Sequence, residues 1–133
     1  MRSVKSVLAG ILALGLPAGG MAQQTGAELY QLEGAEVTVL THGFLSEEEL
    51  QTLRLVGQNR DALMVFLPEA GGHAALAVAP DEGFVRDGMP VESASAISGL
   101  PDIAAAREAA LDACNALRNG GAACQVVLEV APR

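Results

Sequence analysis

The sequence predicts a small α+β protein in which an antiparallel sheet has two helices packed on one face and a disulfide joins the C-terminal helix to the last strand. Apolar residues recur at helical spacing in 46–57 and 101–118. In 35–41 and 124–130 they alternate with polar residues, which is typical of half-buried strands. The chain's two cysteines lie in the second helical stretch and at the start of the last strand.

The first 22 residues have the features of a secretory signal peptide. Arg2 and Lys5 precede an apolar run from Val7 to Leu16. The small residues Gly20 and Ala22 then fit a cleavage site after Ala22. The run has about ten residues, half of the roughly 20 that a spanning helix needs, so no stable membrane anchor should remain after cleavage. We therefore expect a periplasmic or secreted protein.

The mature chain is expected to contain a flexible segment, 23–34, and then a single α+β domain, 35–133. It is acidic. Of the eight basic residues, Arg2 and Lys5 leave with the signal segment, so six arginines face 16 acidic residues and the net charge is −10. Such a surface repels nucleic acid and anionic lipid, and we expect neither as a partner.

Lys5 is the only lysine, so the mature chain has none. Pyridoxal phosphate enzymes hold their cofactor as a Schiff base on a lysine, and a phosphate-binding loop places a lysine beside the phosphates. The composition therefore excludes both in their usual form, and we expect no cofactor.

The first helix has the clearest local signal. Ser46 and Glu49 are spaced as a capping box, in which each side chain accepts a hydrogen bond from the other residue's backbone N–H. Leu53 and Val56 continue an apolar stripe, and Gly57 is expected to end the helix.

The middle of the chain predicts a β-hairpin followed by a loop. Phe84 and Val85 are expected to point inward from that loop. With a strand at 91–98, the chain would have one strand too many for a split βαββαβ of the ferredoxin type, so we favour the simpler antiparallel sheet. The expected segments are strand 62–67, turn 68–72, strand 73–79, loop 80–90 and a further strand at 91–98 that stays open.

The C-terminal helix and strand complete the expected sheet. Pro101 and Asp102 suit the first turn of a helix, and Gly120 or Gly121 suits its C-terminal turn. Val127 interrupts the alternation of the last strand, which indicates an inner strand covered on both faces.

Cys114 and Cys124 are expected to form a structural disulfide. Closing so short a loop should stabilise the domain by about 3 kcal/mol in the chain-entropy model. The alternative is a disulfide carrier, which would need an exposed cysteine of low pKa. Nine residues separate the two cysteines, unlike the Cys-x-x-Cys of oxidoreductases, so we favour the structural bond.

The tract 73–132 resembles a group of small exported bacterial proteins of unknown function. The shared pattern is an Ala-Leu-Ala-Val-Ala-Pro strand from Ala75, a helix with Ala-x-x-x-Ala-Leu-x-x-Cys ending at Cys114, and then Cys124-x-Val-Val and a closing Pro132. Some members carry the name 5-aminolevulinic acid synthase. That activity requires a pyridoxal phosphate lysine, so we do not expect it in this chain.

The candidate reactive residues are few. His42 and His73 are the only imidazoles and would need a carboxylate such as Asp81, Glu82 or Glu69 to bind a metal. No serine of the mature chain lies in a Gly-x-Ser-x-Gly sequence.

The favoured hypothesis is a non-catalytic binding or accessory domain without a catalytic or metal site, whose partner would be an envelope protein. The alternative is a small metal-dependent or hydrolytic enzyme that uses His42 and His73.

Overall fold

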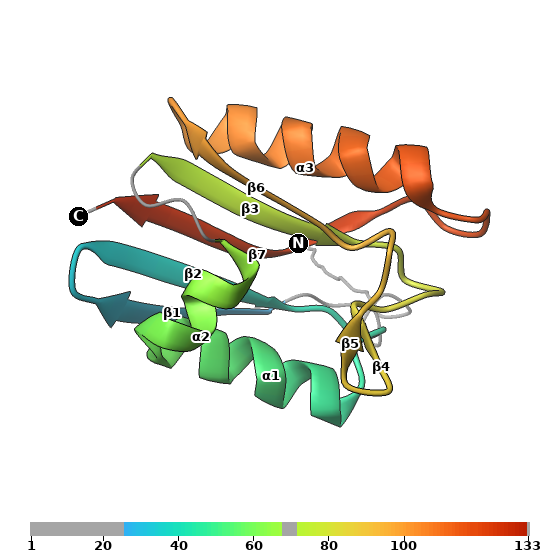
Figure 1. Cartoon of the computed structure of the whole chain (residues 1–133), viewed down its shortest axis with the longest axis horizontal. Helices are drawn as coiled ribbons and strands as arrows, with labels where there is room; N and C mark the ends of the chain where they lie inside the picture. The colour runs from blue at the N-terminus through green and yellow to red at the C-terminus, as the bar shows by residue number, and fades with distance from the viewer. Residues whose placement is uncertain (1–25, 68–71, 133) are drawn as a thin grey trace, which may run out of the picture.

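The computed structural model describes residues 26–67 and 72–132, and within them an antiparallel sheet of five strands in the order β1-β2-β7-β3-β6 (Figure 1). A separate two-stranded hairpin pairs β4 with β5. The α+β class, the antiparallel sheet and the disulfide are confirmed. In chain order the elements are β1 (Gly26–Leu32), β2 (Ala35–Thr41), α1 (Glu47–Gln58), α2 (Arg60–Phe66), β3 (His73–Val78), β4 (Val85–Arg86), β5 (Met89–Pro90), β6 (Ser95–Leu100), α3 (Ile103–Leu117) and β7 (Gln125–Pro132).

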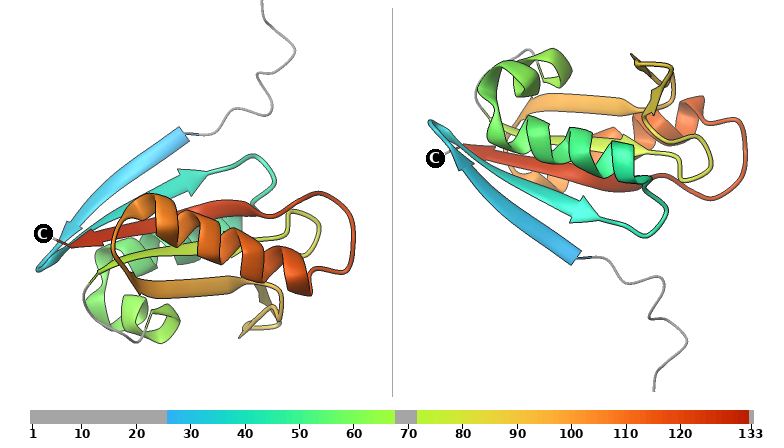
Figure 2. Two further views of the ribbon diagram at one scale, coloured as in Figure 1. Left: turned by 90° about the horizontal axis from the view of Figure 1, so that it is seen from above. Right: turned by 90° about the horizontal axis from the view of Figure 1, so that it is seen from below.

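The helices lie on both faces of the sheet, which corrects the predicted placement on one face (Figure 2). Along β3, Leu76 and Val78 belong to the core beneath α1 and α2, whereas Ala75 and Ala77 belong to the core beneath α3. All of these residues are buried. Because β3 is apolar and buried at every position from Ala74 to Val78, both of its faces must be covered.

Strand β7 occupies the centre of the sheet, between β2 and β3. Val126 packs on the α3 side, and Leu128 and Val130 pack on the α1 side. The register between β3 and β7 shifts between the pairs Leu76–Leu128 and Ala77–Val126, so β7 has one extra residue, Val127. The side chain of Val127 belongs to the α1-side core. The prediction of an inner strand covered on both faces is confirmed.

Helix α1 begins as predicted. The Ser46 hydroxyl accepts a hydrogen bond from the Glu49 backbone N–H at 3.1 Å, and Glu49 Oε1 accepts one from the Ser46 N–H at 3.1 Å. The helix ends at Gln58, one residue beyond the predicted Gly57. Arg54 ties it to β1 through two hydrogen bonds of 2.9 Å to Glu28, which lower the pKa of that carboxyl.

Two predicted segments are different in the structure. Residues 26–32, expected within a flexible segment, form β1 and pair with β2 along their whole length. Residues 62–67, expected as a strand, belong mostly to helix α2, because the Asn59 side chain accepts a hydrogen bond from the Ala62 N–H at 3.0 Å and caps it. The expected turn at 68–72 lies mainly outside the described residues.

Strand β3 therefore has other partners than the predicted hairpin: it pairs with β6 and β7. The open question of a strand at 91–98 is answered by β6, which lies slightly later, at Ser95–Leu100. Phe84 is fully buried and Val85 packs against the same core, as predicted. Within the described residues, no helix combines the length and apolarity needed to cross a membrane.

Candidate functional site

His42 and His73 lie in different parts of the sheet. His42 follows β2, and its Nε2 donates a 2.7 Å hydrogen bond to the Val126 carbonyl oxygen, which can only accept. His73 begins β3 and pairs with Leu100. Val126 pairs with Ala77, four residues further along β3 than His73. At the rise of a strand, roughly 13 Å of β3 therefore lies between His73 and Ala77, the residue opposite the one that His42 binds.

The imidazoles therefore do not form one site. Among the described residues, no three histidines, cysteines or acidic residues are grouped as metal ligands would be. Two of the three carboxylates considered as co-ligands, Asp81 and Glu82, bind backbone amides instead. The third, Glu69, lies outside the described residues. His42 also stacks on Phe44, with ring centroids 5.0 Å apart.

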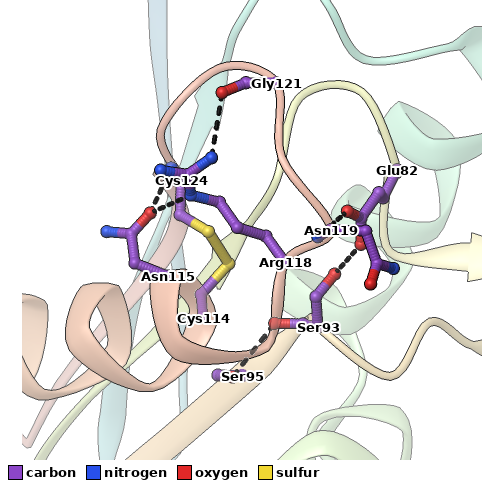
Figure 3. The surroundings of a disulfide bond; sticks show 9 residues. All are labelled: Glu82, Ser93, Ser95, Cys114, Asn115, Arg118, Asn119, Gly121 and Cys124. Carbon is purple, nitrogen blue, oxygen red and sulfur yellow. Dashed lines mark hydrogen bonds between the residues drawn. A yellow bond between two sulfur atoms is a disulfide. The ribbon is translucent and has the colours of Figure 1, made fainter.

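The predicted disulfide joins the last turn of α3 to the residue before β7 (Figure 3). The Cα atoms of Cys114 and Cys124 are 6.2 Å apart, and the two residues are 0% and 5% exposed. A disulfide carrier needs an accessible sulfur, so this burial favours the structural role.

Side chains near the disulfide hold the loop between α3 and β7. Asn115 Oδ1 accepts hydrogen bonds from the Cys124 N–H at 3.0 Å and from Arg118 Nε at 2.9 Å. Arg118 also donates to the Gly121 carbonyl at 2.9 Å. The helix ends at Leu117 and its cap residue, Arg118, is extended, so the predicted glycines belong to the loop and do not cap the helix.

Two consecutive carboxylates bind the same loop from the turn after β3. Glu82 Oε2 accepts the Asn119 N–H at 2.7 Å, and Asp81 Oδ2 accepts the Ala122 N–H at 2.9 Å. The other oxygen of Glu82 accepts the hydroxyl of the buried Ser93 at 2.5 Å (Figure 3). The Asn119 amide, and then Ser93, lower the pKa of Glu82. The sequence did not predict the contacts of Asp81 and Glu82 with this loop, because no local pattern indicates partners that are 41 and 37 residues away in the chain.

A hollow of about 60 Å³ in the described part of the chain has the composition of a binding site. Its apolar lining includes Leu63, Leu67 and Val130, which also belong to the α1-side core. Ligand pockets for small molecules span roughly 300–1,000 Å³, so this hollow fits only a group of side-chain size. It is lined by Gly34, Ala35, Arg60, Leu63, Met64, Leu67, Gly72, Ala74, Val130 and Pro132.

Arg60 is the charged residue of this hollow. It is exposed, and its Nη1 donates to the Glu33 carbonyl oxygen at 2.5 Å. The ion pairs of the described residues involve Arg54 and Arg107, so the Arg60 guanidinium has no carboxylate partner among these residues. On the same helix, Met64 and Val65 are exposed, at 39% and 73%. The sequence gives no sign of this site, since its residues come from four separate elements.

Comparisons of the chain with protein-family models, with curated proteins and with solved structures found no match.

Proposed function

We propose that this chain is a non-catalytic binding or accessory domain that acts outside the cytoplasm, in the periplasm or after secretion. A disulfide is consistent with an oxidising compartment. The signal-peptide pattern of residues 1–22, with cleavage after Ala22, supports the same location. The resemblance to small exported bacterial proteins over 73–132 agrees with it.

The hollow at Arg60 is the observation that carries the binding role. It combines an apolar lining with one guanidinium, and its volume of about 60 Å³ suits a branched aliphatic side chain. Arg60 favours a carboxylate beside that apolar group. The ligand chemistry is thus an aliphatic side chain next to a carboxylate, as at the C-terminus of a peptide or in an acidic segment of an envelope protein.

Catalysis by a histidine pair is not favoured, because His42 binds Val126, whose partner Ala77 lies roughly 13 Å along β3 from His73. A nucleophilic role of Ser46, Ser93 or Ser95 is not favoured either. The buried Ser93 hydroxyl is bound to Glu82, the Ser95 hydroxyl donates to the Ser93 carbonyl, and Ser46 caps α1.

An NMR titration with isovalerate tests the binding role, because isovalerate combines a branched aliphatic group with a carboxylate. We expect saturable shifts in the methyl signals of Leu63, Leu67 and Val130 and none in those of Leu53 and Val56, which lie on α1 and do not line the hollow. 3-Methylbutan-1-ol, which lacks the carboxylate, should bind at least fivefold more weakly.

The matched variants are Arg60→Gln and Arg86→Gln. Arg86 is also exposed, but it donates to the Glu82 carbonyl and does not line the hollow. Arg60→Gln should abolish the preference for isovalerate over the alcohol, and Arg86→Gln should keep it. Absence of saturable shifts, or equal behaviour of the two variants, would contradict the proposal.

A further inference from the structure

The two edge strands of the sheet differ in how they are protected from pairing. Edge strand β6 is interrupted: Gly99 has a φ of +78°, and the register with β3 shifts between His73 and Ala75. Such irregularities are how sheets protect their edges. Edge strand β1 pairs with β2 over seven consecutive residues without a shift, and contains neither proline nor lysine. The β1 edge is therefore the one open to a further strand.

The hairpin register shows which backbone groups of β1 point outward. A two-residue turn, Glu33-Gly34, joins Leu32 to its partner Ala35. The pair that closes such a turn is hydrogen-bonded, and hydrogen-bonded pairs then recur at every second residue. Even-numbered residues of β1 thus bond to β2. The backbone N–H and C=O groups of Ala27, Leu29 and Gln31 point away from the sheet.

The side chains of these three residues are uncharged and exposed, and Leu29 is 59% exposed. They lie on the same face as α3, which packs on β3, β6 and β7 and leaves β1 uncovered (Figure 2). Glu28 is the only charged residue of β1, and it is paired with Arg54 on the other face. No charge on the outer row opposes the approach of a second strand.

We propose that β1 pairs antiparallel with β1 of a second copy of this chain, with the two-fold axis at Leu29. Leu29 then lies opposite the second copy's Leu29, and Ala27 lies opposite the second copy's Gln31. All three outward-facing residues of each copy bond, which gives about six intermolecular hydrogen bonds. The two sheets become one continuous sheet, and the paired leucines bury part of their exposed surface.

Moving the two-fold axis by one residue in either direction gives a less favourable pairing of the two strands. An axis at Glu28 places two carboxylates directly opposite each other, which is destabilising. An axis at Tyr30 pairs only Leu29 with Gln31 within the strands and forms about four hydrogen bonds. With the axis at Leu29, Glu28 lies opposite the second copy's Tyr30. This pairing is compatible, because within one chain the Tyr30 hydroxyl already donates a 2.7 Å hydrogen bond to the Glu28 carboxylate.

Cysteine crosslinking tests both the dimer and its register. A hydrogen-bonded antiparallel pair has Cα atoms about 5.5 Å apart, within the range for a disulfide. Leu29→Cys should form a covalent dimer in a glutathione buffer at least tenfold faster than Leu55→Cys, the matched control on α1 with 55% exposure. Gln31→Cys should be as slow as the control, because its two copies would be roughly 13 Å apart.

Sedimentation equilibrium of the full secreted protein provides the second measurement. The wild type should dimerise reversibly, and Leu29→Lys should weaken the dimer at least tenfold, whereas Leu55→Lys should not. Amide NMR spectra of each variant establish that it is folded. A monomeric wild type at millimolar concentration, or equal crosslinking of Leu29→Cys and Leu55→Cys, would overturn the proposal.

Discussion

Asn119 donates its backbone N–H to Glu82 Oε2 at 2.7 Å, which joins the loop between α3 and β7 to the turn after β3. The Asp81 carboxylate makes a similar bond to the Ala122 N–H. Together with the Cys114–Cys124 disulfide, these contacts fix a loop of small residues. The two carboxylates that sequence reasoning considered as metal ligands thus have a structural role.

The Glu82 contact predicts a pH dependence of stability. Because the pKa of Glu82 is lowered in the folded state, its contribution to the free energy of unfolding is present above the ordinary glutamate pKa. It is lost as the pH falls through the folded-state value. Urea unfolding should therefore show Glu82→Gln less stable than wild type at neutral pH, with the difference shrinking on acidification. The exposed Glu108 serves as control, and Glu108→Gln should show no comparable difference.

Removal of the disulfide should weaken the domain without changing its fold. The double variant Cys114→Ala with Cys124→Ala should lose about 3 kcal/mol in the free energy of unfolding, mainly because the unfolded chain becomes less constrained. Chemical denaturation of the variant measures the loss. An unchanged midpoint would mean that the disulfide contributes nothing to stability.

The close approach of the Asp81 carboxylate requires glycine at position 121. A Cβ at this position would lie 2.0 Å from Asp81 Oδ2, and its φ is +79°. Gly120 also has a positive φ, +109°, but a Cβ there would meet nothing within 4 Å. Both alanine variants pay about 1 kcal/mol for backbone strain. Gly121→Ala should cost about 1 kcal/mol more, because it disrupts the hydrogen bond between Asp81 and Ala122.

A double-mutant cycle isolates the steric conflict between a Cβ at position 121 and the Asp81 carboxylate. In the background of Asp81→Ala, the substitution Gly121→Ala should be no more costly than Gly120→Ala, because the carboxylate has been removed. Equal costs of the two glycine substitutions in the wild-type background would show that Asp81 does not approach Gly121.

The alanines between α3 and β3 leave little room for a larger side chain. Ala106 and Ala110 are fully buried against Ala75 and Ala77 of β3. A larger side chain there would push the helix away from the sheet, so Ala110→Leu should lower the free energy of unfolding by about 1–3 kcal/mol. The exposed Ala116 on the same helix is the control, and Ala116→Leu should be close to neutral in thermal unfolding.

Local signals in the sequence were sufficient for some elements. The capping box of Ser46 and Glu49 needs only residues three positions apart, and the structure contains it. The strand at 35–41 and the pairing of Cys114 with Cys124 were predicted for similar reasons, since alternation and the count of cysteines leave few choices.

Features that depend on distant partners were predicted poorly. The apolar run at 62–67 is too short for its period to distinguish helix from strand, and the Asn59 cap decided the outcome. Strand β1 lacks a regular alternation of apolar and polar residues, and it is stabilised by β2 and by Arg54 of α1. The hollow at Arg60 and the contacts of Asp81 and Glu82 join segments that only the folded chain brings together.

The intact mass of the protein isolated from the cells that produce it tests the central claim of an exported, disulfide-bonded domain. We predict a chain that begins at Gln23 and is lighter by two hydrogen atoms than its reduced form, with no free thiol in the folded state. A chain that retains residues 1–22, or one in which Cys114 and Cys124 react with a thiol reagent without reduction, would contradict the account.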